Sequence, residues 1–367
     1  MNTRTLLEYQ WPYLASFLAA TDTLEQSANE FGALKRKRSV DSVHTLLRLI
    51  FAWAFCGMSL RQTTAWAEAA NVATLSNVAL LKRLRLASDW LEYLLTLKLA
   101  ERVSPPAGCE GRLRIVDATM ISKPGSKGAD WRVHLSLDLA SSTIDHVELT
   151  DYRGGETLNR FSLRSGDVVI ADRGYAHLSG LAPIAIGHGD FLVRIPWSSV
   201  PLEHHDGNPL DLFSFLRGLP EGEVGEIDVR IRSDAKRNLP AVPVRLIAVR
   251  KSEAAAADTR IKLTKAASKK RRTPDPRSLE AAAYTFIITS IPSETLSAKQ
   301  VLDLYRFRWQ VEIAFKRLKS LLDLDELPAK DASLTRTFIY TKLLAALLLD
   351  DFTQAYVSFS PWGFNIR

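Results

Sequence analysis

Three acidic residues occupy positions from which an active site could be built. Asp117 follows the apolar run 113–116, and Asp172 ends a second apolar run, 168–171; both runs are typical of buried strands. Glu312 lies within an amphipathic helical pattern. If the two strands are neighbours and the helix packs across them, the three carboxylates meet. Each acid alone also fits an ordinary turn or cap residue, but three such coincidences are a weaker explanation.

Carboxylates gathered in one place repel one another, and a divalent cation relieves that repulsion. A ligand set of hard oxygens without His or Cys favours Mg²⁺ or Mn²⁺. Two such ions can activate a water or a 3′-hydroxyl and stabilise the leaving oxygen of an in-line phosphoryl displacement. The acidic residues therefore predict phosphoryl-transfer chemistry with two ions.

The segment 305–320, YRFRWQVEIAFKRLKS, predicts one helix with two different faces. At 3.6 residues per turn, the polar positions fall within an arc of roughly 80°. These positions are Tyr305, Arg308, Glu312, Lys316 and Lys319. The opposite side is apolar: Phe307, Val311, Ala314, Phe315, Leu318 and Leu322. The polar face could hold phosphates around one carboxylate, or it could be a solvated face with common i,i+4 ion pairs.

The same segment resembles the Tyr-x2-Arg-x3-Glu-x6-Lys signature of bacterial insertion-sequence transposases of the IS-four group. Tyr305, Arg308, Glu312 and Lys319 have the required spacing. Asp117 in IVDATMI and Asp172 in IADRGY look like the first and second acids of that family. The family consists of DDE enzymes with an RNase H-like core, and a β-rich insertion separates its second and third acids.

This resemblance implies a role for each residue. Asp117, Asp172 and Glu312 would be catalytic and would bind two Mg²⁺ (or Mn²⁺) ions. The implied DNA contacts are Tyr305, Arg308, Lys316, Lys319 and Arg173. Trp309 would stack or wedge near the cleaved end, although a partly buried aromatic beside the core is an equal interpretation.

The implied activity is cleavage at the ends of an insertion sequence and transfer of the 3′-hydroxyl into target DNA. The implied partners are double-stranded DNA, as terminal inverted repeats and target, and a second copy of the chain in a synaptic dimer. Two alternatives stay open. One is a structure-specific nuclease on the same core, and the other is an inactive or truncated DNA-binding derivative.

The elements that would position these residues follow from periodicity. Residues 1–104 predict a helical DNA-binding region, in which 59–86 resembles a helix-turn-helix with Ser59 and Ser76 as N-caps. Its second helix carries Lys82, Arg83 and Arg85 as candidate DNA contacts. An ordinary helical hairpin is the alternative.

The remainder predicts an α/β fold with a mixed sheet. Residues 105–196 would form the first part of an RNase H-like core, with strands at 112–121, 131–140, 143–152, 168–171 and 191–195 and a short helix at 156–163. Residues 197–290 would form a β-rich insertion domain. Residues 291–367 would complete the core with the Glu312 helix, 297–322, and a last helix, 333–351.

Charge and composition favour a polyanionic partner. The net charge is +7, and residues 259–277 contain eight Lys or Arg and one Asp, which matches that excess. We interpret this segment as a mobile basic loop. Two cysteines and no signal-peptide pattern fit a reducing cytoplasm, and the resemblance implies a bacterial one, with the protein at the nucleoid when bound to DNA. The apolar stretch FIYTKLLAALLL contains Lys342 and is short for a bilayer span, so no membrane contact is expected.

Overall fold

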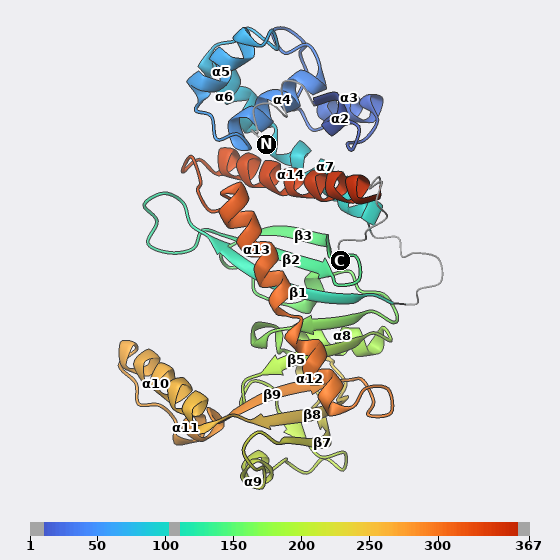
Figure 1. Ribbon diagram of the computed structural model, residues 1–367, viewed down its shortest axis with the longest axis vertical. Helices are drawn as coiled ribbons and strands as arrows, with labels where there is room; N and C mark the ends of the chain where they lie inside the picture. Colours follow the sequence, from blue (N-terminus) through green and yellow to red (C-terminus); the bar gives the residue numbers. More distant parts are fainter. Residues whose placement is uncertain (1–10, 103–110, 359–367) are drawn as a thin grey trace.

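The computed structural model describes residues 11–102 and 111–358, so the predicted boundary at 104 lies outside the described residues. The molecule is elongated (Figure 1). A helical cap stands at one end, a layer of two long helices follows, and a mixed sheet fills the rest of the length. A helical arm projects from the side near the far end of the sheet.

The N-terminal part consists of helices and connecting loops in its described residues, in agreement with the helical pattern of the sequence. Its helices are α2 (Trp11–Ala15), α3 (Thr21–Glu30), α4 (Val43–Ala54), α5 (Leu60–Ala69), α6 (Asn77–Leu86) and α7 (Ser88–Arg102). The hydroxyls of Ser59 and Ser76 accept hydrogen bonds from the backbone of Gln62 and Ala79, which confirms both N-caps. Helix α4 is apolar nearly all round and forms the centre of this cap.

Within the described residues, nine strands form one mixed sheet in the order β3-β2-β1-β4-β5-β9-β8-β7-β6. The strands are β1 (Leu113–Ile121), β2 (Trp131–Asp138), β3 (Thr143–Asp151), β4 (Val168–Ala171), β5 (Asp190–Ile195), β6 (Leu202–Glu203), β7 (Val224–Ile231), β8 (Val242–Arg250) and β9 (Tyr284–Thr289). Strands β1, β2 and β3 form an antiparallel meander, and β4 and β5 run parallel to β1. The predicted adjacency of β1 and β4 is therefore correct.

Two sequence predictions differ from the structure in this region. The β-rich segment 197–290 does not form a sheet of its own, because β9 pairs with β5 and carries β8, β7 and β6 outward from the same sheet. The expected helix at 156–163 is only a short 3₁₀ turn, Leu158–Arg160. Alternation of apolar residues locates strands, but it does not say which edge of a sheet they join.

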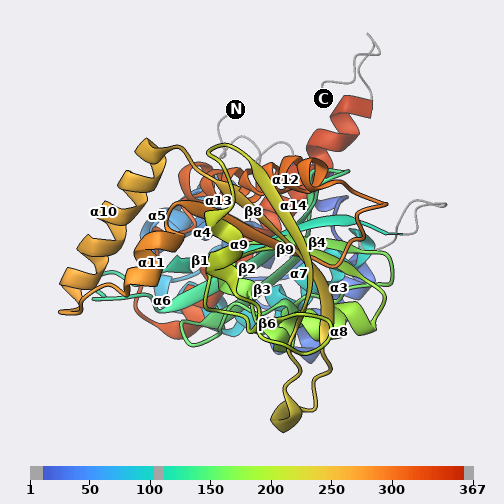
Figure 2. The ribbon, with the colours of Figure 1, turned by 90° about the horizontal axis from the view of Figure 1, so that it is seen from below.

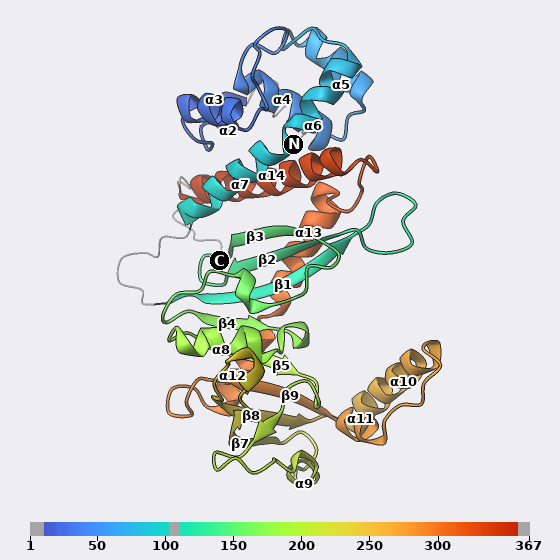
Figure 3. The same cartoon turned by 180° about the vertical axis from the view of Figure 1, so that it is seen from behind.

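The sheet is covered on both faces. Alternate side chains of β1 point to opposite sides, so Ile115 joins the core shared with the helical layer while Val116 joins the core under α8 (Leu178–Ile186). Helix α13 (Trp309–Leu322) crosses β1 and β2 on the face to which Ile115 points, as Figures 1 and 3 show from both sides. This crossing brings the helix of the third acidic residue to β1, the strand of the first.

Helix α14 (Ala332–Ser358) is the longest helix of the described chain. Its segment Ala332–Thr353 is long and apolar enough to cross a membrane, so the length argument made from the sequence was wrong. However, 78% of its most apolar window is buried inside the protein. Thr337 donates to the Leu84 carbonyl at 2.7 Å, and Tyr340 donates to Glu92 at 2.6 Å. Helix α14 is a core helix between the cap and the sheet.

The basic segment 259–277 is mostly helical, which corrects the prediction of a mobile loop. Helix α10 (Glu253–Lys269) extends into it and α11 (Pro276–Ala281) follows, forming the projecting arm (Figure 2). Ala, Lys and Arg are strong helix formers, and Ser252 caps the N-terminus of α10. Low complexity was a poor guide here because the same residues suit a solvated helix.

A buried ion network fixes the strand that carries Asp117. Arg112 contacts Asp145 at 3.1 Å and Asp167 at 2.9 Å, and Arg114 contacts Asp145 at 2.8 Å. All four side chains are at most 7% exposed. The network joins β1 to β3 and to the residue just before β4, so it holds the two acid-bearing strands together.

Candidate active site

The helix expected over 297–322 is two helices. Helix α12 (Ala298–Arg306) begins after the Ser297 cap, as predicted, and α13 begins at Trp309. Between them the backbone amides of Arg308 and Gln310 bond to carbonyls three residues back. This tighter turn changes the direction of the side chains, so Phe307 is 44% exposed and does not lie on the apolar face.

The first two acids emerge side by side from parallel strands. Ile115 of β1 is in register with Ile170 of β4, and each acid lies two residues further along its chain. The Asp117 carboxylate accepts a hydrogen bond from the amide of Ala118 at 2.8 Å. Asp172 caps the 3₁₀ helix Arg173–Tyr175 by accepting from the amide of Gly174 at 2.7 Å.

Arg308 connects the third acid to the first. Its Nη2 hydrogen-bonds to Glu312, and its Nη1 lies 3.7 Å from Oδ2 of Asp117. The Glu312 side chain is 55% exposed, whereas the side chains of Arg308 and Asp117 are about one-fifth exposed. In this arrangement a guanidinium group occupies the space between two of the predicted ligands.

The pKa of Asp117 is raised to about 6, first by burial and also by the neighbouring charges of Asp172 and Glu156. The amide of Ala118 and the guanidinium of Arg308 oppose this shift. Burial, together with the charge of Asp172, also raises the pKa of Glu156. Sequence reasoning missed Glu156 because it assigned this residue to a short helix, 156–163, and nothing in that pattern places it beside Asp172.

The donor chemistry of this cluster fits a hard divalent cation, because carboxylate oxygens that disfavour one another's charge are relieved by such an ion. The distances between these carboxylates, however, are too long for a metal site in the present arrangement. Within 11–102 and 111–358, no three His, Cys, Asp or Glu residues lie close enough together to hold a metal ion as they stand. Arg308 would have to release Glu312 for the three acids to share an ion.

Other residues of the signature line the same cleft. Asp117 and Glu312 face it together with Lys316 and Lys319. Tyr305 lies next to Arg308, and burial raises the pKa of its hydroxyl to about 12. Trp309, the first residue of α13, is 50% exposed.

The remaining candidate residues lie elsewhere. Arg173 is exposed next to Asp172 but faces a separate pocket with Arg194 and Lys251. On α6, Lys82 is exposed, whereas Arg83 donates to the Arg36 carbonyl at 2.6 Å and Arg85 contacts Asp331 at 3.2 Å. Helix α6 belongs to the cap, on the other side of α14 from the sheet (Figure 3).

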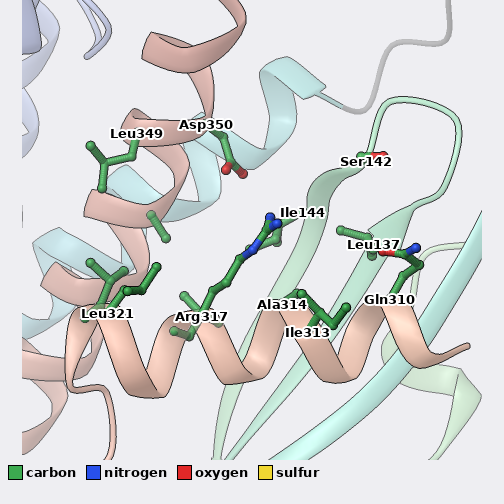
Figure 4. Close-up of a pocket in the computed structure, with 13 residues that line it drawn as sticks. Leu137, Ser142, Ile144, Gln310, Ile313, Ala314, Arg317, Leu321, Leu349 and Asp350 are labelled. Atoms are coloured by element: carbon green, nitrogen blue, oxygen red, sulfur yellow. The ribbon is translucent and has the colours of Figure 1, made fainter. Parts of the chain in front are cut away.

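A second pocket lies on the side of α13 that faces away from the acids. Figure 4 shows Ile313, Ala314 and Leu321 of α13 lining it, with Arg317 reaching across toward Asp350 of α14. Its lining is mostly apolar and contains none of the three predicted catalytic acids. This pocket is therefore distinct from the acidic cleft.

With this geometry in view, comparison with known proteins gives one consistent answer. Residues 108–348 match the family model described as "Transposase DDE domain". The chain is 42% identical over 354 residues to the putative transposase InsL for insertion sequence element IS186A of Escherichia coli K12, covering 96% of each chain. It is 41% identical over 355 residues to the transposase for insertion sequence element IS421 of Escherichia coli, again covering 96% of each.

A structural comparison agrees on the fold. The piggyBac transposase, in a cryo-EM structure of its synaptic complex with hairpin DNA, superposes with a TM-score of 0.51 and 11% identity. The match covers 100% of this chain and 76% of that one.

Fold and site together thus define a transposase with a mixed-sheet catalytic domain. The chain belongs to the DDE transposase family, and it is a DNA transposase of the insertion-sequence type. The resemblance seen in the sequence is confirmed at the level of the family.

Proposed function

We propose that this transposase cuts DNA at the ends of an insertion sequence and joins the freed 3′-hydroxyl to target DNA. The observation that supports this most is that Asp117 and Asp172 come from adjacent parallel strands, β1 and β4, and that the Glu312 helix crosses β1. In the order β3-β2-β1-β4-β5, strand β2 alone runs opposite to the other four. This is the arrangement that we expect for an RNase H-like core.

In this proposal Asp117, Asp172 and Glu312 hold two Mg²⁺ or Mn²⁺ ions. Bound ions would supply Lewis-acid activation of the attacking oxygen and stabilisation of the leaving oxygen. The chain's own residues orient the DNA: Lys316 and Lys319 line the cleft beside Asp117, where they would bind backbone phosphates. Trp309, exposed at the start of α13, would stack on a base near the cut.

Arg308 exchanges one set of partners for another in this proposal. Without DNA it neutralises Asp117 and Glu312. When a phosphate enters the cleft, the guanidinium would bind that phosphate and release Glu312 to the ions, because arginine matches phosphate and carboxylate geometry equally well. Substrate arrival would thus complete the set of acids.

The cap would recognise the element's terminal repeats through α6, and Arg173 would contact DNA beside Asp172. We propose that two copies act together on paired ends, in the bacterial cytoplasm and at the nucleoid when bound to DNA. The 42%-identical relative comes from Escherichia coli, which supports a bacterial setting.

The decisive test compares Asp117→Asn, Asp172→Asn and Glu312→Gln with the parent on a DNA fragment carrying the element end. Each variant should lower cleavage and joining by more than about 100-fold, the upper limit seen for groups that only support a metal ligand. Binding to the end should change little. Near-parent cleavage by any one variant would remove that residue from the site, and nicking without joined products would favour a nuclease.

A further inference from the structure

The side chain of Glu156 lies against the turn that follows Asp172, although β4 separates the two residues along the chain. Oε2 of Glu156 is only 1.8 Å from the point where a Cβ on Gly174 would stand, and Oδ1 of Asp172 is 3.1 Å from that point. The glycine thus leaves room for one carboxylate directly beside another. Glu156 also acts electrostatically on Asp117.

Two guanidinium groups pair with three of the carboxylates around this turn. Arg308 serves Asp117 and Glu312, while Arg132 lies 3.7 Å from Glu156 and also donates to the Gly154 carbonyl at 3.0 Å. The charges of Asp172 and Glu156 disfavour each other, and a divalent cation would relieve this repulsion.

A buried hydroxyl provides a second, independent observation. Tyr175 follows the same turn, is 0% exposed, and its hydroxyl has no hydrogen-bond partner in the described structure. The carboxylates of Asp117, Glu156 and Asp172 all act on this hydroxyl. A buried polar group without a partner is costly, and a water bound between these carboxylates would satisfy it.

We propose that Glu156 is a fourth member of the acidic set and that it holds one hydrated divalent cation together with Asp117 and Asp172. Mg²⁺ and Mn²⁺ commonly keep part of their water shell, so the three carboxylates need not all touch the ion. This site does not require Glu312, which Arg308 retains in the absence of DNA. The inference rests on the proposed function and adds an ion that is bound before substrate.

The experiment measures Mn²⁺ binding to the full-length protein without DNA, by the paramagnetic resonance signal of the free ion. Glu156→Gln should weaken Mn²⁺ affinity by about 10- to 100-fold, as loss of a supporting carboxylate does in other metal sites. Removing a carboxylate outside the cluster should leave this affinity unchanged. The matched control is Glu148→Gln, which removes a carboxylate of β3 that pairs with Arg160 outside the cluster.

A second variant avoids touching any carboxylate. Gly174→Ala places a methyl group where Oε2 of Glu156 now lies and must push that side chain aside, so it should cause a similar loss of Mn²⁺ affinity. Thermal unfolding in EDTA reports folding separately. If Glu156→Gln binds Mn²⁺ like the parent, or only lowers the melting temperature, Glu156 is not part of the cation site.

Different results would overturn the role of Glu156 and the proposed function. If Asp117→Asn weakens Mn²⁺ binding while Glu156→Gln does not, the role of Glu156 is overturned and the proposed function stands. If Asp117→Asn, Asp172→Asn and Glu312→Gln all retain cleavage, the proposed function itself is overturned.

Discussion

At the scale of single residues, Asp117 is largely buried, although the role proposed for it, binding a cation, requires a charged carboxylate. Its pKa is raised from 3.8 to about 6, so the folded protein binds this proton more tightly than the unfolded chain does. The stabilising contribution of the protonated group is present below about pH 4 and is lost as the pH rises through about 6. The site is thus less stable when it is ready to bind a cation.

The raised pKa of Asp117 leads to a stability prediction for Asp117→Asn in EDTA. At pH 8 the variant should be more stable than the parent by on the order of 1–3 kcal/mol, because it removes a buried charge. At pH 4 the gain should largely disappear. Chemical unfolding at both pH values measures the difference, with the exposed Asp325→Asn of the same cleft as control. A gain of equal size at both pH values would contradict the raised pKa.

At the scale of elements, α6 contains one basic side chain that is exposed and another that holds the fold together, so their substitutions should have different effects. Lys82→Ala should weaken binding to the element end without lowering the melting temperature, because Lys82 is exposed. Arg83→Ala should instead cost about 1 kcal/mol of stability, because its guanidinium donates to the Arg36 carbonyl. Footprinting and thermal unfolding distinguish the two. An unchanged footprint for Lys82→Ala would move end recognition away from this helix.

The basic arm gives a second prediction at this scale. The end of α10 and the turn after it contain Lys269, Lys270, Arg271 and Arg272. Replacing all four by Ala should flatten the slope of log K against log salt for non-specific duplex DNA by roughly two to four units. Single-turnover cleavage of pre-bound ends should change little at low salt. An unaltered slope would mean that the arm is only a solvated surface.

The sequence predicted the strands of the core better than it predicted connections between elements. The runs before Asp117 and Asp172 located strands β1 and β4, because buried strands leave a strong apolar pattern. The joint at Phe307–Arg308 had no glycine or proline to reveal it. Glu156 and the partners of Arg308 depend on contacts between distant segments, which no local pattern encodes.

At the scale of the whole molecule, one core joins the cap to the sheet. A single cluster of buried side chains includes Leu46 of α4, Leu344 of α14 and Ile115 of β1. Leu344→Ala should therefore destabilise both parts together by about 2–5 kcal/mol. Hydrogen exchange of amides in α4 and in β1 reports each part. Faster exchange in α4 alone would show that the cap unfolds independently.

The position of α14 between cap and sheet also bears on the DNA that such an enzyme can use. Because the two parts share one core in the described residues, α6 should keep a nearly constant distance from the acidic cleft. On the proposed function, bases read by α6 must lie a constant number of base pairs from the bond that is cut. One inserted base pair shifts and rotates that bond by roughly a tenth of a helical turn. The element's ends should then tolerate substitutions over generations more readily than insertions or deletions.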